Sequence, residues 1–195
     1  MTLVERVKRI LLQPKQEWEV IAGESTTTPD LYRNYIIPLA AIGPVASIIG
    51  MSIVGIGMPF GSAFRIPIVT AILSAGVHYV LSLVGVYVLA LIIDFLAPTF
   101  SGEKNPGQAL KLSAYSSTAA WIAAIFVIIP ALGILGITGL YSLYLLYEGI
   151  PVLMKAPRGK ALVYTIAVAV AAIVIFAVIG SIARVLIPYP VGMPG

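Results

Sequence analysis

Residues 66–97 form the longest apolar stretch of the chain and read IPIVTAILSAGVHYVLSLVGVYVLALIIDFLA. The stretch contains a single carboxylate, Asp94, and a single histidine, His78. About 20 apolar residues in a helix are enough to cross the hydrocarbon core of a bilayer, which is about 30 Å thick. This stretch is longer than one crossing requires, so we expect its helix to tilt or to extend beyond the membrane.

Four further stretches are long and apolar enough to cross a bilayer. Together with the first, they predict membrane-spanning helices at residues 35–56, 66–97, 110–129, 132–154 and 162–187. Only a short turn around Pro130 separates the third stretch from the fourth, so these two are expected to form a tight helical hairpin. We therefore predict an all-α polytopic membrane protein. Residues 35–195 form a bundle of five transmembrane helices, and residues 1–34 form an amphipathic cytoplasmic segment.

The composition of the chain supports this class. Of its 195 residues, 59% are hydrophobic and 10% are charged, whereas about 25% are charged in an ordinary soluble domain. A soluble chain of this length has too little interior to bury so much apolar surface, and a disordered chain is far more polar. The sequence contains no cysteine, which excludes disulfides, thiolate catalysis and metals bound by cysteine.

The basic residues predict how the chain is oriented. Ten of the twelve Lys and Arg residues lie in three regions that five spans place on one side of the membrane. These are Arg6, Lys8, Arg9, Lys15 and Arg33, then Lys104 and Lys111, then Lys155, Arg158 and Lys160. The other two are Arg65 and Arg184. Basic residues concentrate on the cytoplasmic side, so we predict a cytoplasmic N-terminus and an external C-terminus. In a membrane protein, the formal charge of +4 indicates lipid headgroups as partners and no nucleic acid.

The first 34 residues differ in character from the rest. Apolar residues recur at helical spacing between charged ones: Leu3, Val7, Ile10 and Leu11. This pattern predicts a basic amphipathic helix that ends at Pro14. A second short helix is expected around Trp18, whose side chain would anchor at the membrane interface. The segment could bind a protein partner or anionic lipid, or it could simply cover the cytoplasmic end of the bundle.

His78 is the first of four candidate polar residues within the spans. Ser74, His78 and Ser82 follow one another at four-residue spacing, so they share one helix face, which we expect to point into the bundle. The imidazole could serve as a proton or ion relay. It could also be a neutral side chain that hydrogen-bonds a neighbouring helix. The second interpretation is preferred because the chain has no other histidine.

The other candidates are Asp94, Tyr144 and Glu148. Glu148 shares a helix face with Tyr144 near the cytoplasmic end of the fourth span. A carboxylate there could hold a cation or a proton, or it could pair with a basic residue of the interface: Lys111, Lys155 or Arg158. We expect an ion pair or a wet pocket, with Tyr141 or Tyr144 within hydrogen-bonding reach. Asp94 is placed similarly on the second span, on a different face from His78.

The remaining sequence features indicate packing. Pro38 and Pro44 predict a kink in the first span. A stripe of small residues in the third span is expected to pack against another helix; its members are Ser113, Ser116, Ser117, Ala120 and Ala124. The chain has no Walker loop, no metal-ligand spacing and no nucleophile elbow. We therefore predict no catalytic, cofactor-binding or metal-binding residue.

Several segments carry a family resemblance. They are YIIPLA at residues 35–40, KLSAYSST at 111–118, IPALG at 129–133 and GLYSLYLLYEGIPVLM at 139–154. This ordered set resembles the Yip family of Ypt/Rab-interacting membrane proteins, and in particular its prokaryotic branch. The resemblance implies five helices with a cytoplasmic N-terminus. The run Asp30-Leu-Tyr32 is similar to the start of the Asp-Leu-Tyr-Gly-Pro signature of eukaryotic members, with Arg33 and Asn34 in place of Gly-Pro.

These observations predict a non-enzymatic integral membrane protein of Yip type in the plasma (inner) membrane of a prokaryote. The resemblance implies a role in membrane organisation or trafficking-like scaffolding, with a possible protein partner at the N-terminal segment. The alternative is a small ion or proton transporter or channel that uses His78, Asp94 and Glu148. An intramembrane enzyme is a third possibility. A polar cavity that reaches the midplane would favour transport, and a packed interior would favour scaffolding.

Overall fold

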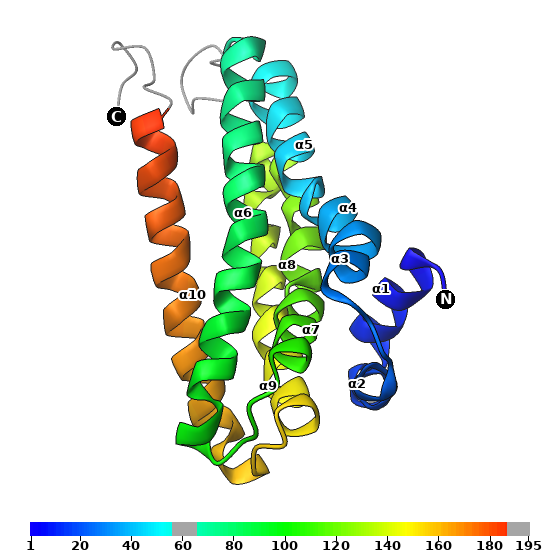
Figure 1. Ribbon diagram of the computed structural model, residues 1–195. Coiled ribbons are helices and arrows are strands. Elements are labelled where there is room, and N and C mark those ends of the chain that lie inside the picture. The colour runs from blue at the N-terminus through cyan, green and yellow to red at the C-terminus, as the bar shows by residue number, and fades with distance from the viewer. Residues whose placement is uncertain (56–65, 187–195) are drawn as a thin grey trace.

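The computed structural model describes residues 1–55 and 66–186, and every regular element in these two ranges is a helix (Figure 1). The α-helices are α1 (Leu3–Leu12), α2 (Pro14–Gly23), α3 (Thr28–Leu31), α4 (Ile37–Ala40), α5 (Ile42–Ile48), α6 (Ile68–Leu96), α7 (Pro106–Ser116), α8 (Thr118–Ala123), α9 (Tyr141–Leu153) and α10 (Arg158–Leu186). The π-helices are η1 (Tyr32–Ile36) and η2 (Ile49–Val54), and the 3-10 helices are η3 (Ala97–Phe100), η4 (Ala124–Ile128) and η5 (Pro130–Leu140). The predicted all-α class is confirmed for this part of the chain.

Within the described ranges, four helical segments are long and apolar enough to cross a membrane: Thr28–Val54, Ile68–Phe100, Pro106–Ile128 and Arg158–Leu186. They correspond to the first, second, third and fifth predicted spans. The predicted fourth span is helical through Leu153, as η5 followed by α9, but it is not one of these four. The first segment begins at Thr28 and so runs across the predicted boundary at residue 34. Some predictions concern residues outside the described ranges. They are the ends of two predicted spans, at Ile56 and Ile187, the position of Arg65 and that of the C-terminus.

Proline breaks the first segment into short pieces. Pro38 and Pro44 have no N–H to donate, so a continuous ladder of backbone hydrogen bonds cannot form past them. The chain has a π-helical turn, η1, just before Pro38 and a turn at Ala41 between α4 and α5. A second π-helical turn, η2, follows α5. The kink that the sequence predicts is present in this form, and proline and π-helical turns are its usual causes.

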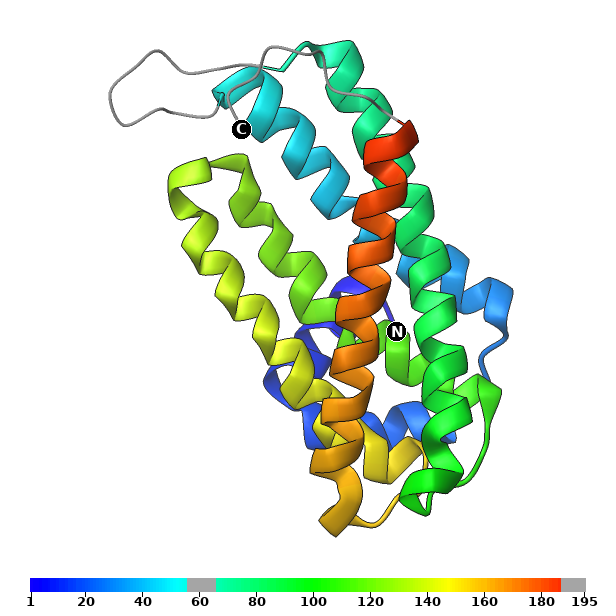
Figure 2. The same cartoon turned by 90° about the vertical axis from the view of Figure 1, so that its left-hand side faces the viewer.

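The long helices form the frame of the bundle. α6 packs against α7 and α10, and α9 packs against both α7 and α10 (Figures 1 and 2). At 1.5 Å per residue, α6 is about 43 Å long, which exceeds the hydrocarbon thickness as expected. Ser113 Oγ of α7 donates to the Val86 carbonyl of α6 at 2.8 Å. A member of the predicted small-residue stripe therefore lies at a helix contact.

The predicted hairpin follows α7. Ile129 alone separates η4 from η5, and the two arms, α8–η4 and η5–α9, lie side by side in Figure 2, coloured green to yellow. The arms approach closely because Gly139 leaves room for Ala120, whose Cα would lie 3.4 Å from a Cβ at Gly139. Small residues thus determine how near the arms come to each other.

The N-terminal helices α1 and α2 pack against the bundle beside α7, α8 and α9. A capping box starts α1: Glu5 N–H donates to Thr2 Oγ1, and Thr2 N–H donates to the Glu5 carboxylate. This backbone hydrogen bond lowers the pKa of Glu5. The predicted amphipathic helix is present, and Ile10 on its apolar face is fully buried in the protein core. Pro14 is the first residue of α2, a position that suits proline.

Candidate functional site

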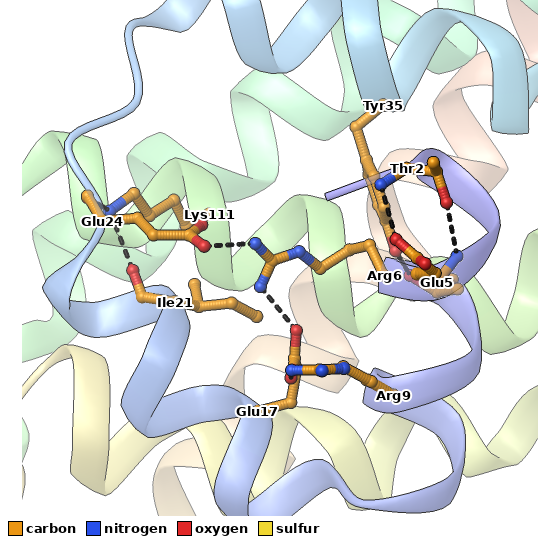
Figure 3. A network of polar contacts seen from close by, with 10 residues as sticks. Thr2, Glu5, Arg6, Arg9, Glu17, Ile21, Glu24, Tyr35 and Lys111 are labelled. Carbon is orange, nitrogen blue, oxygen red and sulfur yellow. Dashed lines mark hydrogen bonds and ion pairs between the residues drawn. The ribbon is translucent and has the colours of Figure 1, made fainter.

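A buried ionic cluster joins the two N-terminal helices to each other and to α7 (Figure 3). The Arg6 residue is only 7% exposed, and its guanidinium donates to Glu17 Oε1 at 2.6 Å and to a carboxylate oxygen of Glu24. The same guanidinium lies 5.6 Å from the centre of the Tyr115 ring on α7, within the range of a cation–π interaction. Glu17 is 3% exposed and also lies 3.8 Å from Arg9 Nη1. Each buried charge is therefore compensated, as burial requires.

Helix α7 supplies the C-terminal cap of α2. Lys111 is buried, and its Nζ donates to the carbonyl of Ile21 at 3.0 Å and to that of Glu24. Gln108 Nε2 donates to the carbonyl of Ala22 at 2.9 Å. The last carbonyls of a helix have no partner within it and carry partial negative charge, so a buried cation is stabilised there. Lys111 therefore lies within a helix, and it is not a partner of Glu148, for which it was one of three possible cations.

A close aromatic contact completes this interface. Trp18 is fully buried, and its ring forms a T-shaped contact with Tyr115, with the ring centres 6.3 Å apart. It lies directly against Gly149 of α9, where a Cβ would come within 2.7 Å of Trp18 Cε2 and 2.6 Å of Leu112 Cδ1. Only glycine fits at this position. The predicted role of Trp18 as an interfacial anchor was wrong, because the indole packs inside the protein.

Glu148 lies next to this contact and is 6% exposed. Its two oxygens lie 3.8 Å from Arg158 Nη1 and 3.9 Å from Lys15 Nζ. Arg158 is one of the three cations that the sequence suggests as partners of Glu148, whereas Lys15 is not among them. The tyrosine hydroxyl expected nearby is engaged elsewhere, because Tyr141 donates to the carbonyl of Leu11 at 3.0 Å. Tyr144 packs against the ring of Tyr141 and is 37% exposed.

Asp94 has a different environment near the end of α6. Its Oδ1 is buried and has no hydrogen-bond partner among the described residues. Tyr164 of α10 comes close, but its hydroxyl donates to the carbonyl of Ile93, the preceding residue. The structure therefore places Asp94 at the contact between α6 and α10, apart from Glu148.

His78 lies in a third environment. Together with Ser74, Ser82 and Gly85, it lines a cavity of about 510 Å³ between α5, α6, α8 and α10. The three residues therefore share a helix face as predicted, but only Ser74 is buried, and His78 is exposed. The histidine bonds its own helix, however, through Nδ1 and the Ser74 carbonyl at 2.9 Å, and this differs from the expected bond to a neighbouring helix.

Comparison with known proteins places the chain in a family. The family model of the Yip1 domain, which describes its sequence pattern, matches residues 8–179. The chain belongs to the Yip1 domain family. Among curated proteins it is similar to inner membrane protein YohC of Escherichia coli (strain K12) and to the protein of the same name in strain O6:H1. Each is 22% identical over 117 residues, which cover 60% of this chain and 60% of the relative. No solved structure matches the chain.

In this Yip1 domain protein, sequence reasoning missed the ionic cluster at Arg6, Glu17, Glu24 and Lys111. A signal for it exists. Arg6 is four residues before Ile10, and Glu17 is four residues before Ile21, so each charge shares a face with a core residue. A charge on the apolar face of an amphipathic helix indicates a buried partner. The partner itself comes from another helix and cannot be identified by spacing.

We expect Glu148→Gln in this Yip1 domain protein to lower the free energy of unfolding by less than about 1 kcal/mol. Its two cations are exposed and lie beyond hydrogen-bonding distance, and pairs of this kind contribute little. Glu148→Leu should be tolerated as well, because both cations can be solvated by water. Denaturant unfolding in detergent micelles would measure both variants. A loss as large as that of a buried pair would contradict this assignment.

Proposed function

We propose that this Yip1 domain protein is a non-enzymatic scaffold that organises the inner membrane of a prokaryote. The proposal rests on how α1 and α2 are attached to the rest of the bundle. The ionic cluster, the cap from Lys111 and the contact between Trp18 and Gly149 fix these helices to the bundle. A fixed pair of helices presents a constant outer surface, as a platform for a protein partner requires.

The proposal includes five membrane-spanning helices, a cytoplasmic N-terminus and an external C-terminus. One end of the molecule brings the basic regions together. Lys155 Nζ lies 2.7 Å from Glu103 of the loop before α7, and Lys15 of α2 lies 3.9 Å from Glu148 of α9. The N-terminal segment and the two loops meet at one end, so an even number of spans precedes the last loop. The last helix, α10, then makes the total odd, and the basic end is proposed to lie in the cytoplasm.

The surroundings of the polar residues favour scaffolding over transport. The cavity beside His78 is lined mainly by apolar side chains, and neither Asp94 nor Glu148 lines it. The three candidate sites for a proton or ion therefore belong to separate environments. A transporter brings such groups together along one path.

Cysteine labelling tests the orientation with a clean background, because the chain has no cysteine of its own. We expect Gly159→Cys, between Arg158 and Lys160, to react with a membrane-impermeant maleimide only after the cells are permeabilised. A Cβ at Gly159 has open space around it, so the change should be structurally neutral. Leu186→Cys at the far end of α10 serves as the matched external position. Labelling of Gly159→Cys in intact spheroplasts would contradict the proposed topology.

A flux measurement tests the functional class. Purified protein in vesicles with a pH gradient and a K⁺ gradient should dissipate neither gradient faster than protein-free vesicles do. The control is a set of vesicles to which a known ionophore is added. A flux that disappears in both His78→Gln and Glu148→Gln, while both variants stay folded, would replace the scaffold with a transporter.

A further inference from the structure

The cavity beside His78 lies at the depth of the hydrocarbon core. On α6 its lining residues run from Ser74 to Leu89, in the middle of the candidate span Ile68–Phe100. On α10 they run from Ala172 to Ile179, in the middle of Arg158–Leu186. Only a molecule that is soluble in the membrane can reach a site at this depth.

The size and walls of the cavity suit a small lipid. Its volume of about 510 Å³ falls within the range of ligand sites, which are about 300–1,000 Å³ and mostly apolar. The cavity is partly open, and His78 is an exposed residue in it. Ile175 and Phe176 of α10 and Leu89 of α6 contribute apolar surface to its walls. A hydrocarbon chain would fill this space with favourable contacts.

Three of the polar side chains that line the cavity offer acceptors, namely His78, Ser82 and Ser117; Ser47, Ser74 and Trp121 also line it. The carbonyl of Ser74 can only accept, so His78 Nδ1 must carry the proton of their 2.9 Å hydrogen bond. In a neutral imidazole this leaves Nε2 as an acceptor. Ser82 Oγ donates to the carbonyl of Tyr79 at 2.7 Å, and Ser117 Oγ donates to that of Ser113 at 2.7 Å. Each hydroxyl has therefore used its one donor and keeps its lone pairs.

We infer that this cavity binds a lipid alcohol, with its hydrocarbon chain along the apolar wall and its hydroxyl donating to His78 Nε2. A hydroxyl is the simplest donor that remains soluble in a bilayer. A charged headgroup would meet no counter-ion here, because no Lys, Arg, Asp or Glu is among the described residues that line the cavity.

Photolabelling tests the site. The full chain is reconstituted in phosphatidylcholine vesicles with a long-chain fatty alcohol that carries a diazirine, and the labelled peptides are identified by mass spectrometry. We expect labelling of the cavity faces of α6 and α10. Ala172→Phe fills the cavity and should reduce this labelling at least fivefold. Val174→Phe on the exposed face of α10 is the matched control and should leave labelling of the cavity unchanged. Equal labelling in both variants would show contact with bulk lipid only and overturn the inference.

A second comparison tests the hydrogen bond and does not depend on whether Ala172→Phe folds. The methyl ether of the same alcohol has no donor, so it should label the wild-type cavity several-fold less than the alcohol does. His78→Gln keeps an acceptor and should retain the preference, whereas His78→Phe should abolish it. Thermal unfolding in detergent confirms that each variant is folded. Equal labelling by alcohol and ether in the wild-type protein would rule out recognition of the hydroxyl.

Discussion

Replacement of Gly149 by valine should detach the N-terminal helices from the bundle and lower the free energy of unfolding by about 3 kcal/mol. Overpacking of a core costs about 1–3 kcal/mol and sometimes more. Here the upper part of that range is expected, because a Cβ would lie 2.7 Å from the rigid ring of Trp18 and 2.6 Å from Leu112. The indole has no space to retreat into, since it also contacts Tyr115.

Two measurements check this result. Denaturant unfolding in micelles gives the loss of stability, and limited trypsin digestion reports detachment through faster cleavage after Lys8 and Lys15. Gly76→Val is the matched control, because Gly76 is also helical and a Cβ there meets no atom within 4 Å. Trp18→Leu should partly rescue Gly149→Val by removing the ring. If Gly149→Val and Gly76→Val were equally stable, the contact would not hold the N-terminal helices in place.

Replacement of Glu17 by alanine should lower the free energy of unfolding by about 3–5 kcal/mol, which is the usual loss when one partner of a buried ion pair is removed. Arg6 is only 7% exposed and would keep Glu24 alone as a charged partner. The guanidinium is largely shielded from water, since the Arg6 side chain is 9% exposed and lies against the ring of Tyr115. The remaining charge therefore bears most of its desolvation cost without compensation.

Glu19→Ala is the matched control for this variant. Glu19 belongs to the same helix, but it is exposed, so its loss should cost less than about 1 kcal/mol. The double variant Arg6→Met with Glu17→Met removes both charges and should recover much of the stability, because apolar residues often replace a buried pair without loss. Denaturant unfolding of all three variants would measure these differences. A small effect of Glu17→Ala, similar to that of Glu19→Ala, would show that the cluster does not stabilise the N-terminal helices.

Much of the fold follows from local features of the sequence. Apolar length alone predicts four of the spans found in the described residues, because a bilayer imposes a minimum length on a crossing helix. The start of α1 follows from Thr2 and Glu5, whose capping box is a short-range contact. The irregular first span follows from Pro38 and Pro44, because each proline lacks the N–H that would complete a backbone hydrogen bond in its own helix. The fourth stretch is harder to assign, because its first half is the 3-10 helix η5.

The candidate residues illustrate the limit of local reasoning. Four-residue spacing correctly placed Ser74, His78 and Ser82 on one face. The same reasoning could not decide which cations pair with Glu148, because its partners, Lys15 and Arg158, come from α2 and from the start of α10. It also placed Trp18 at the membrane interface. That residue type prefers the interface on average, but a glycine on a distant helix makes room for it inside the protein.

The sequence by itself determined that this is an all-α membrane protein of the Yip1 domain family with a helical, amphipathic N-terminus. These properties depend on apolar length, on periodicity and on ordered segments, all of which are local along the chain. Only the tertiary structure decided that Arg6, Glu17 and Lys111 are buried together and that His78 faces a cavity. Burial of a charge is stable only when a partner lies opposite, and here the partners come from helices far apart in the sequence.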